Sequence, residues 1–247
     1  MIAQDGDIPE MLSALTTEKT EAVRKELENS IVATALRINE PAQRDPLVIA
    51  AFGTAKDREN RSSLIRILGR IGTADGLAAI VPALKERDKE VMMTTVRALS
   101  EWPTPAAYND LHALATTSTD RTVRTLAVRG VVRTTGLDTS LSHDATLARY
   151  REAFALTKDA GEKKQLLALM GAAPSLAAFT MAADALKDPA LKADAEITVV
   201  TIAEPIAKQH HAAITGTLEQ LVSSTNPTVV AKSKDLLARI ARLTGTK

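Results

Sequence analysis

Apolar side chains recur at the spacing of one helix face along the whole chain. In the stretch KERDKEVMMTTVRALSEW (85–102), Asp88 precedes residues at offsets +3, +7, +8 and +11 that suit a buried face. These residues are Val91, Thr95, Val96 and Leu99. The offsets mark one side of a helix with 3.6 residues per turn. The pattern therefore predicts an amphipathic helix that begins just after Asp88.

The same template starts again at six other anchor residues. They are Thr20, Asp57, Asp120, Asp159, Asp188 and Asn226. Each has a side-chain oxygen that can accept a hydrogen bond from an amide in the first turn of a helix. We therefore predict that every anchor N-caps a helix. Polar residues interrupt the apolar face in several copies, namely Glu28, Asn60, Glu162, Glu196, Ser233 and Lys234.

Successive anchors are separated by about 34 residues, and a second apolar helix precedes each anchor, as in DGLAAIVPALKE and LAAFTMAADAL. The sequence thus predicts an all-α fold, a right-handed α-α superhelix of about seven helical hairpins. We expect a single repeat domain over 1–247. The expected repeats are 5–40, 41–72, 73–103, 104–136, 142–173, 174–208 and 209–247.

Glycine and proline punctuate these repeats. Gly72 and Gly136 follow apolar helices, where a left-handed C-terminal cap is expected. Thr104 and Pro105 are typical of an N-cap followed by proline in the first helical position.

The stretch LIRILGRIGTADGLAAIVPALKERDKEVMMTTVRALSEWPTPAAYNDL (64–111) resembles the short HEAT-like repeat of bacterial proteins. In that family a helix ends in Leu-Gly, a segment such as IGTADGLAAIVPALK (71–85) intervenes, and an acidic turn then leads to Val-Arg at the start of the next helix. Val-Arg occurs at 23–24 and 123–124, but Val-Met stands at 91–92 and Val-Val at 229–230. The resemblance implies that the second helix of each hairpin lines a concave surface.

Composition supports this family over other helical repeats. The chain has two Tyr, three Phe and one Trp, so Ala, Leu, Val and Ile must fill the core. Tetratricopeptide repeats have a similar period but need bulky aromatic residues in every hairpin. The ankyrin motif is absent from the sequence.

The net charge and the absence of cysteine limit the kinds of binding and catalysis that we expect. The formal net charge is +1, so no overall field attracts nucleic acid or an anionic membrane. The lack of cysteine excludes disulfides, thiolate nucleophiles and cysteine zinc sites. No apolar stretch approaches the roughly 18 residues that span a bilayer. We expect a chain without membrane insertion, and the sequence does not define its compartment or oligomeric state.

Candidate catalytic and metal-binding residues have simpler interpretations. Ser142, His143 and Asp144 are consecutive, whereas members of a hydrolytic triad normally come from separated segments, so we expect Ser142 or Asp144 to cap the next helix. His210 and His211 are neighbours whose side chains diverge, without the spacing of a metal site. We therefore predict no catalytic residue, no metal and no cofactor.

Five arginines form the candidate binding site. Arg66, Arg97 and Arg129 stand at offset +9 of three successive repeats, and Arg70 and Arg133 stand at offset +13. Both offsets lie opposite the buried face. Stacked repeats would align these residues into a basic stripe. The stripe is either a solvated face paired with Glu59, Glu90 and Glu101, or a groove for an acidic segment.

Three functions are compatible with this pattern. The first is a non-catalytic scaffold that binds another protein or a neighbouring domain through its concave surface. The second is nucleic-acid binding, similar to HEAT-like DNA glycosylases, against which the near-neutral charge and the single Trp102 both argue. The third is a function similar to that of HEAT-like bilin lyases, which only the shared repeat supports.

Overall fold

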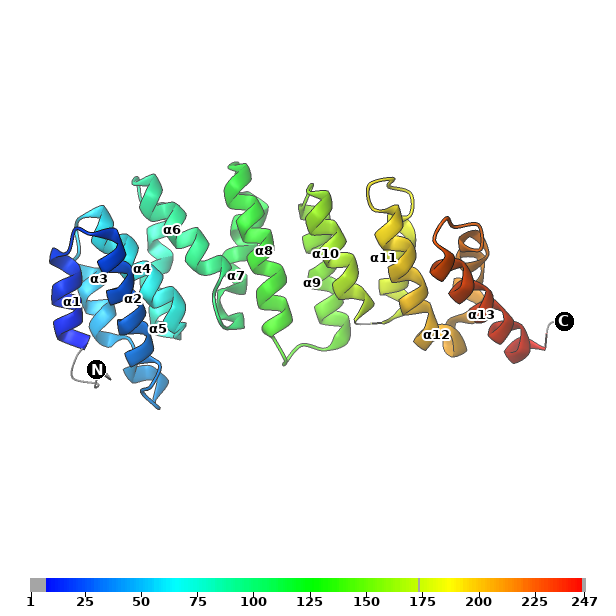
Figure 1. The fold of residues 1–247 in the computed structure, drawn as a ribbon, viewed down its shortest axis with the longest axis horizontal. Coiled ribbons are helices and arrows are strands. Elements are labelled where there is room, and N and C mark those ends of the chain that lie inside the picture. Colours follow the sequence, from blue (N-terminus) through cyan, green and yellow to red (C-terminus); the bar gives the residue numbers. More distant parts are fainter. Residues whose placement is uncertain (1–7, 173, 246–247) are drawn as a thin grey trace. The chain divides into compact units, whose positions relative to one another are not determined.

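The structure is a computed structural model that describes residues 8–172 and 174–245 (Figure 1). Every regular element of the described residues is a helix. The chain divides into two compact parts, Met1–Thr139 and Ser140–Lys247, here called unit 1 and unit 2. The predicted all-α fold built from helical hairpins is therefore confirmed, and each unit is described by itself.

Unit 1 consists of helices that pair in chain order. Its α-helices are α1 (Ile8–Thr17), α2 (Glu21–Ala35), α3 (Pro46–Thr54), α4 (Arg58–Ile71), α5 (Ala74–Ile80), α6 (Lys89–Ser100), α7 (Tyr108–Thr117) and α8 (Arg121–Leu137). Short 3-10 helices are η2 (Pro41–Gln43), η3 (Val81–Lys85) and η4 (Pro105–Ala107). The second helices of successive hairpins, α2, α4, α6 and α8, pack each against the next and form one layer.

Unit 2 contains longer helices. They are α9 (His143–Leu156), α10 (Ala160–Gly171), α11 (Leu176–Ala185), α12 (Lys192–Leu221) and α13 (Pro227–Thr244). Helix α12 includes Pro205 and a break at His210, where φ is −125° and ψ is 23°. Its first half packs on α10 and acts as a second helix, and α13 packs on α12 in turn. The expected boundary between residues 208 and 209 lies beside this break.

The template residues form the core. Val91, Val96 and Leu99 are at most 1% exposed, and the equivalent residues of α8, Val123, Val128 and Val131, are at most 4% exposed. Several polar residues that interrupt the apolar pattern are buried as well. They are Glu28, Asn60, Glu162, Glu196 and Ser233. The helical phase therefore buries these side chains although they are polar, whereas Lys234 is exposed. All of the buried ones except Ser233 have a hydrogen-bond partner.

Five anchors cap their helices as predicted. Their side chains accept hydrogen bonds from first-turn amides; they are Asp57, Asp88, Asp120, Asp159 and Asn226. Ser142 also caps α9, because its Oγ accepts a bond of 3.2 Å from the Ala145 amide. This bond confirms the capping interpretation of the Ser-His-Asp sequence.

Two anchors behave differently. Thr20 has the extended N-cap conformation, but its side chain makes no capping bond. Asp188 is not an N-cap at all, because α12 begins later, with Leu191 as its N-cap. The Asp188 carboxylate instead accepts a bond of 2.9 Å from the Ala190 amide within a turn. Pro189 has no amide hydrogen to offer this cap, and the chain makes an extra turn before the helix starts.

One predicted glycine cap is confirmed and one is wrong. Gly72 has a φ of 75° and ends α4 in the left-handed conformation. Gly136 remains inside α8, which continues to Leu137. The buried face of α8 extends past Val131 to Thr134 and Thr135, so packing holds the helix together for another turn. Thr104 precedes the 3-10 helix η4, with Pro105 in its first position, and makes no side-chain cap.

Candidate binding surface

A basic residue four positions after the anchor ties the two helices of a hairpin together. Arg24 Nη1 donates to the carbonyls of Leu15 at 2.7 Å and Glu18 at 3.0 Å. Arg61 Nη1 contacts the carbonyls six and nine positions before it in the same way. Arg124 Nη1 reaches the Ser118 carbonyl at 3.3 Å. Carbonyls at the end of a helix lack intrahelical partners, so the arginine of the Val-Arg pair has a structural task.

Arginines, some of them the same ones, also connect one hairpin to the next. Arg24 Nη2 donates to Asn60 Oδ1 at 2.9 Å and to Ser63 Oγ at 2.8 Å, which joins α2 to α4. Arg58 pairs with Asp88 at 2.7 Å, and this hydrogen bond lowers the pKa of the Asp88 carboxyl. Arg61 pairs with Glu86 in the turn before α6. The ties along unit 1 are thus largely made by guanidinium groups.

The five arginines of the predicted stripe are all exposed, on three helices that pack in succession. Arg66 and Arg70 lie on α4, Arg97 lies on α6, and Arg129 and Arg133 lie on α8. The structure therefore brings them to the outward side of one helical layer of unit 1. We call these five residues the arginine cluster. Their role in binding stays a prediction.

Two members of the arginine cluster are held by α2. Arg66 binds Glu28 through two bonds, Nε to Oε2 at 3.0 Å and Nη2 to Oε1 at 2.6 Å. The Glu28 side chain is only 7% exposed, whereas that of Arg66 is 46% exposed. Arg70 Nη1 donates to Asn29 Oδ1 at 2.8 Å. Sequence analysis missed Glu28 as a partner, although a carboxylate at a core offset needs a nearby cation or hydrogen-bond donor.

The carboxylates suggested as partners by the sequence, those of Glu59, Glu90 and Glu101, contribute less to holding the arginine cluster. Of these, Glu90 approaches Arg97 at 4.0 Å, and both side chains are more than half exposed. A long, solvated pair of this kind restrains a side chain weakly. The arginine cluster thus combines guanidinium groups oriented by α2 with that of Arg97, which is only weakly restrained.

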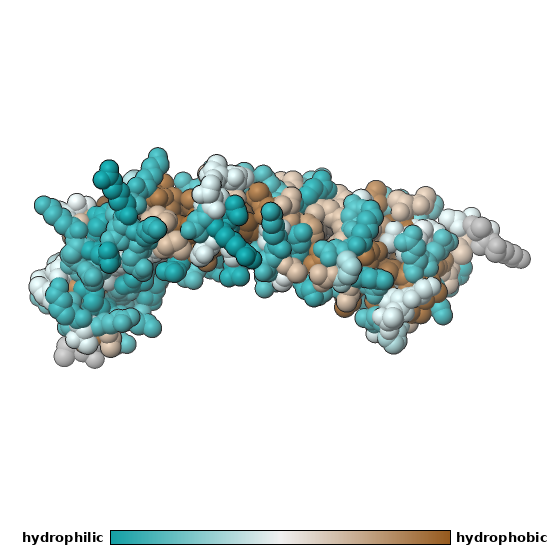
Figure 2. Space-filling model, turned by 90° about the horizontal axis from the view of Figure 1, so that it is seen from above, coloured by the Kyte–Doolittle hydropathy of each residue, from teal (hydrophilic) through white to brown (hydrophobic). Residues whose placement is uncertain are grey.

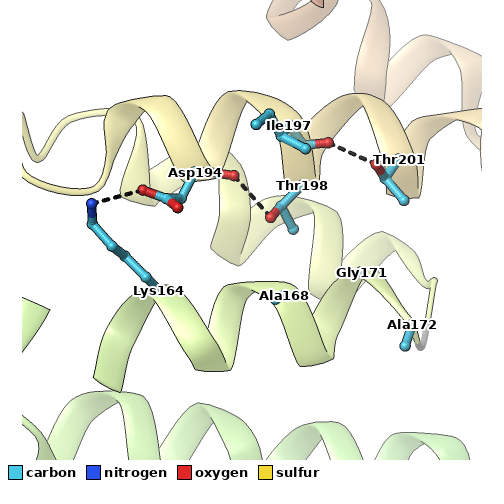
Figure 3. A pocket seen from close by; sticks show the side chains of 8 residues that line it. All are labelled: Lys164, Ala168, Gly171, Ala172, Asp194, Ile197, Thr198 and Thr201. Carbon is cyan, nitrogen blue, oxygen red and sulfur yellow. Dashed lines mark hydrogen bonds and ion pairs between the residues drawn. The ribbon is translucent and has the colours of Figure 1, made fainter. Parts of the chain in front are cut away.

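Unit 2 has different residues at the same outward offsets. They are Ala168 and Ala172 on α10, Ile197 and Thr201 on α12, and Asp235 and Arg239 on α13. The first four line a groove of about 430 Å³ between α10 and α12 (Figure 3). Where α4, α6 and α8 of unit 1 present arginine, α10 and α12 of unit 2 present small and aliphatic side chains.

The polar groups of this groove are satisfied within it (Figure 3). Lys164 Nζ pairs with Asp194 Oδ2 at 3.0 Å. Thr198 and Thr201 donate their hydroxyl hydrogens to carbonyls one turn earlier in α12. Ile197 is 51% exposed. The groove therefore offers a mainly apolar surface that ends at an ion pair.

Two further hollows flank the contact of α12 with α13. The larger, of about 610 Å³, is lined by Glu204, Pro205, Ala207, Lys208, Arg239, Arg242 and Leu243. The smaller, of about 280 Å³, is lined by Glu204, Ala231, Lys232, Asp235 and Leu236. Seen from above, hydrophobic patches lie between hydrophilic side chains over unit 2 (Figure 2).

Other candidate groups lie elsewhere or have structural contacts. Asp45 is 1% exposed, burial raises the pKa of its carboxyl, and Thr73 donates a hydrogen bond to it. His210 stands at the break in α12. Within residues 8–172 and 174–245, no three His, Cys, Asp or Glu side chains are grouped so that they could hold a metal ion. None of the helices described has the length and apolarity to cross a membrane.

Comparison with known proteins gives a family match over part of the chain and distant structural similarities. A search of curated proteins finds no match. One similar structure is an engineered protein, with a TM-score of 0.49 and 19% identity over 95% of this chain and 68% of that one. The structure of human deoxyhypusine hydroxylase in complex with glycerol has a TM-score of 0.38 and 14% identity, over 96% of this chain and 97% of that one. A second engineered protein has a TM-score of 0.37 and 18% identity, over 96% of this chain and 97% of that one.

The family model for HEAT repeats matches residues 45–131. This segment includes α4, α6 and most of α8, and thus four of the five residues of the arginine cluster. The resemblance to HEAT repeats seen in the sequence is therefore confirmed over this segment.

Proposed function

We propose that this protein is a non-catalytic scaffold that binds another protein, or a neighbouring domain, through the outward side of its second helices. The observation that supports this proposal is the arginine cluster, exposed on the second helices of three successive hairpins of unit 1. Helical-repeat proteins use such extended surfaces for binding. The consecutive Ser-His-Asp residues serve as a helix start, which removes the most obvious candidate for catalysis.

The chemistry of the arginine cluster favours an acidic segment of the partner. Guanidinium groups bind carboxylates through two parallel hydrogen bonds. Glu28 and Asn29 already hold Arg66 and Arg70 in place, so these side chains lose little conformational freedom on binding. Glu101 lies at the remaining outward offset of α6 and would oppose an acidic residue at that point.

The test is a charge reversal that leaves the ion pair between Arg66 and Glu28 intact. We expect Arg97→Glu with Arg133→Glu to weaken binding of an oligoglutamate peptide by about tenfold or more, a change equal to about 1.4 kcal/mol. The matched control is Lys56→Glu with Arg87→Glu, which reverses two exposed charges in turns away from the cluster. Fluorescence anisotropy measures the affinities, and circular dichroism checks the helical content.

Equal affinity of the two double variants would remove the proposal. Duplex DNA, titrated over a salt series, distinguishes the nucleic-acid alternative, since phosphate binding weakens steeply with salt. Trp102 is fully buried and is thus not available to stack on a base. Affinity capture from the source cells with the wild type and both double variants then links the peptide result to a native partner.

A further inference from the structure

We infer that the hollow between α12 and α13 is a docking site for a short acidic peptide segment of a partner protein, with an aliphatic side chain beside its carboxylates. The inference rests on the proposed function only in treating the chain as a protein-binding scaffold. It concerns unit 2 and shares no residue with the arginine cluster.

Each wall of the hollow is formed by one face of one helix. Helix α12 contributes Glu204, Pro205 and Lys208, with Ala207 largely buried behind them. Helix α13 contributes three residues at spacings of three and four, which share one side of that helix. They are Arg239, Arg242 and Leu243. The hollow is open to solvent, and its volume of about 610 Å³ is larger than that of the groove between α10 and α12, at about 430 Å³.

The charges of the lining are unbalanced. Arg239 Nη1 lies 3.7 Å from Glu204 Oε1 and 3.9 Å from Asp235 Oδ2, so it is shared between two carboxylates. Lys208 and Arg242 are exposed, and the described residues provide no ion-pair partner for either of them. Arg242 Nε donates to the Ala238 carbonyl at 3.2 Å, which holds the guanidinium along its own helix. Two cations thus remain for an anionic ligand.

An apolar surface adjoins these cations. Leu243 is 58% exposed, the largest value among the exposed large hydrophobic side chains described. Pro205 is exposed on the facing helix. An aliphatic side chain placed between them would remove apolar surface from water on both sides. A free phosphate would use only the cations, so the combination favours a peptide whose carboxylates flank an aliphatic residue.

The experiment titrates isotope-labelled protein with short capped peptides and follows the backbone amide signals by NMR. The probe has a Glu-Leu-Glu core, and the controls have Gln-Leu-Gln and Glu-Ala-Glu cores. We expect the probe to shift signals of α12 and α13, and each control to bind more weakly. Arg242→Glu should raise the dissociation constant of the probe about tenfold, an ordinary effect for a close charge reversal.

The matched control variant is Lys234→Glu, which reverses an exposed charge of α13 outside the hollow and should leave the affinity unchanged. Leu243→Ser should weaken binding while keeping the preference for glutamate over glutamine.

Three results would overturn the inference: no shift at about 1 mM probe, equal binding of the Gln-Leu-Gln peptide, or shifts at Arg97 and Arg133 instead. The last result would leave the proposed function intact, whereas loss of binding at the arginine cluster alone would not affect the α12–α13 site. Failure of one proposal is therefore distinguishable from failure of the other.

Discussion

The two units use the same helical template and differ in what it presents to solvent. At the core offsets, Val96 in unit 1 and Leu167 in unit 2 are equally buried. At the outward offset +9, unit 1 has Arg66, Arg97 and Arg129, whereas unit 2 has Ala168, Ile197 and Asp235. The contrast shows that burial fixes one side of each second helix and leaves the other side open to specialisation.

The units also differ in how polar groups join their helices. Unit 1 uses guanidinium groups, such as Arg24 between α2 and α4. In unit 2, two buried carboxylates accept hydroxyl hydrogen bonds instead: Glu162 from Thr157, and Glu196 from Ser224 at 2.6 Å. A buried carboxylate without such a donor would be costly, so these hydroxyl groups allow glutamate at a core offset.

The largest expected effect tests the shared core. Leu99→Asp in unit 1 and Leu167→Asp in unit 2 each place an unpaired charge at a fully buried position. We expect each to lower the free energy of unfolding by more than about 4 kcal/mol, measured by urea denaturation with circular dichroism. Ile197→Asp is the control, because this residue is 51% exposed and should change stability little.

A smaller effect tests the ion pair in unit 1 between the buried Glu28 and the partly exposed Arg66. Arg66→Ala leaves the Glu28 carboxylate without its partner at a site that is 7% exposed. We expect a loss of about 1–3 kcal/mol in the free energy of unfolding, since Arg66 itself is partly solvated. Arg97→Ala should cost less than about 0.5 kcal/mol. Similar losses for both variants would show that the pair with Glu28 does not stabilise α2 against α4.

Helix caps should be alike in the two units. Asp120→Ala and Asp159→Ala each remove a side-chain acceptor from a first turn, at a cost of about 1 kcal/mol. Asp188→Ala should cost less, because Asp188 bonds only within a turn before α12. Thermal denaturation of the three variants checks this order, and an equal loss for Asp188→Ala would contradict the altered start of α12.

The smallest effect concerns pH. Burial raises the pKa of Asp45 in the folded state, so the folded protein favours the protonated carboxyl. The resulting stability is present below the unfolded pKa and is lost as the pH rises through the folded value. We expect Asp45→Asn to flatten this loss in urea denaturations from acidic to neutral pH. Unchanged pH dependence would show that Asp45 does not titrate with folding.

Some of the candidate site was predictable and some was not. The offsets placed all five residues of the arginine cluster on the exposed side, because helical geometry relates them directly to the core positions. The partners of Arg66 and Arg70 on α2 were missed, since the distances between them in the sequence exceed one repeat. The hollow between α12 and α13 was missed too, because its lining combines two helices that no local pattern relates.

The sequence by itself determined the helical-hairpin repeat, the buried side of each second helix and most of the helix starts. These features depend on a periodicity of a few residues and on local hydrogen bonds, which a single segment already contains. Only the tertiary structure decided where α8 and α12 begin or end, which carboxylate holds Arg66, and where hollows form. Those outcomes depend on packing between helices, whose contacts join residues that lie far apart in the chain.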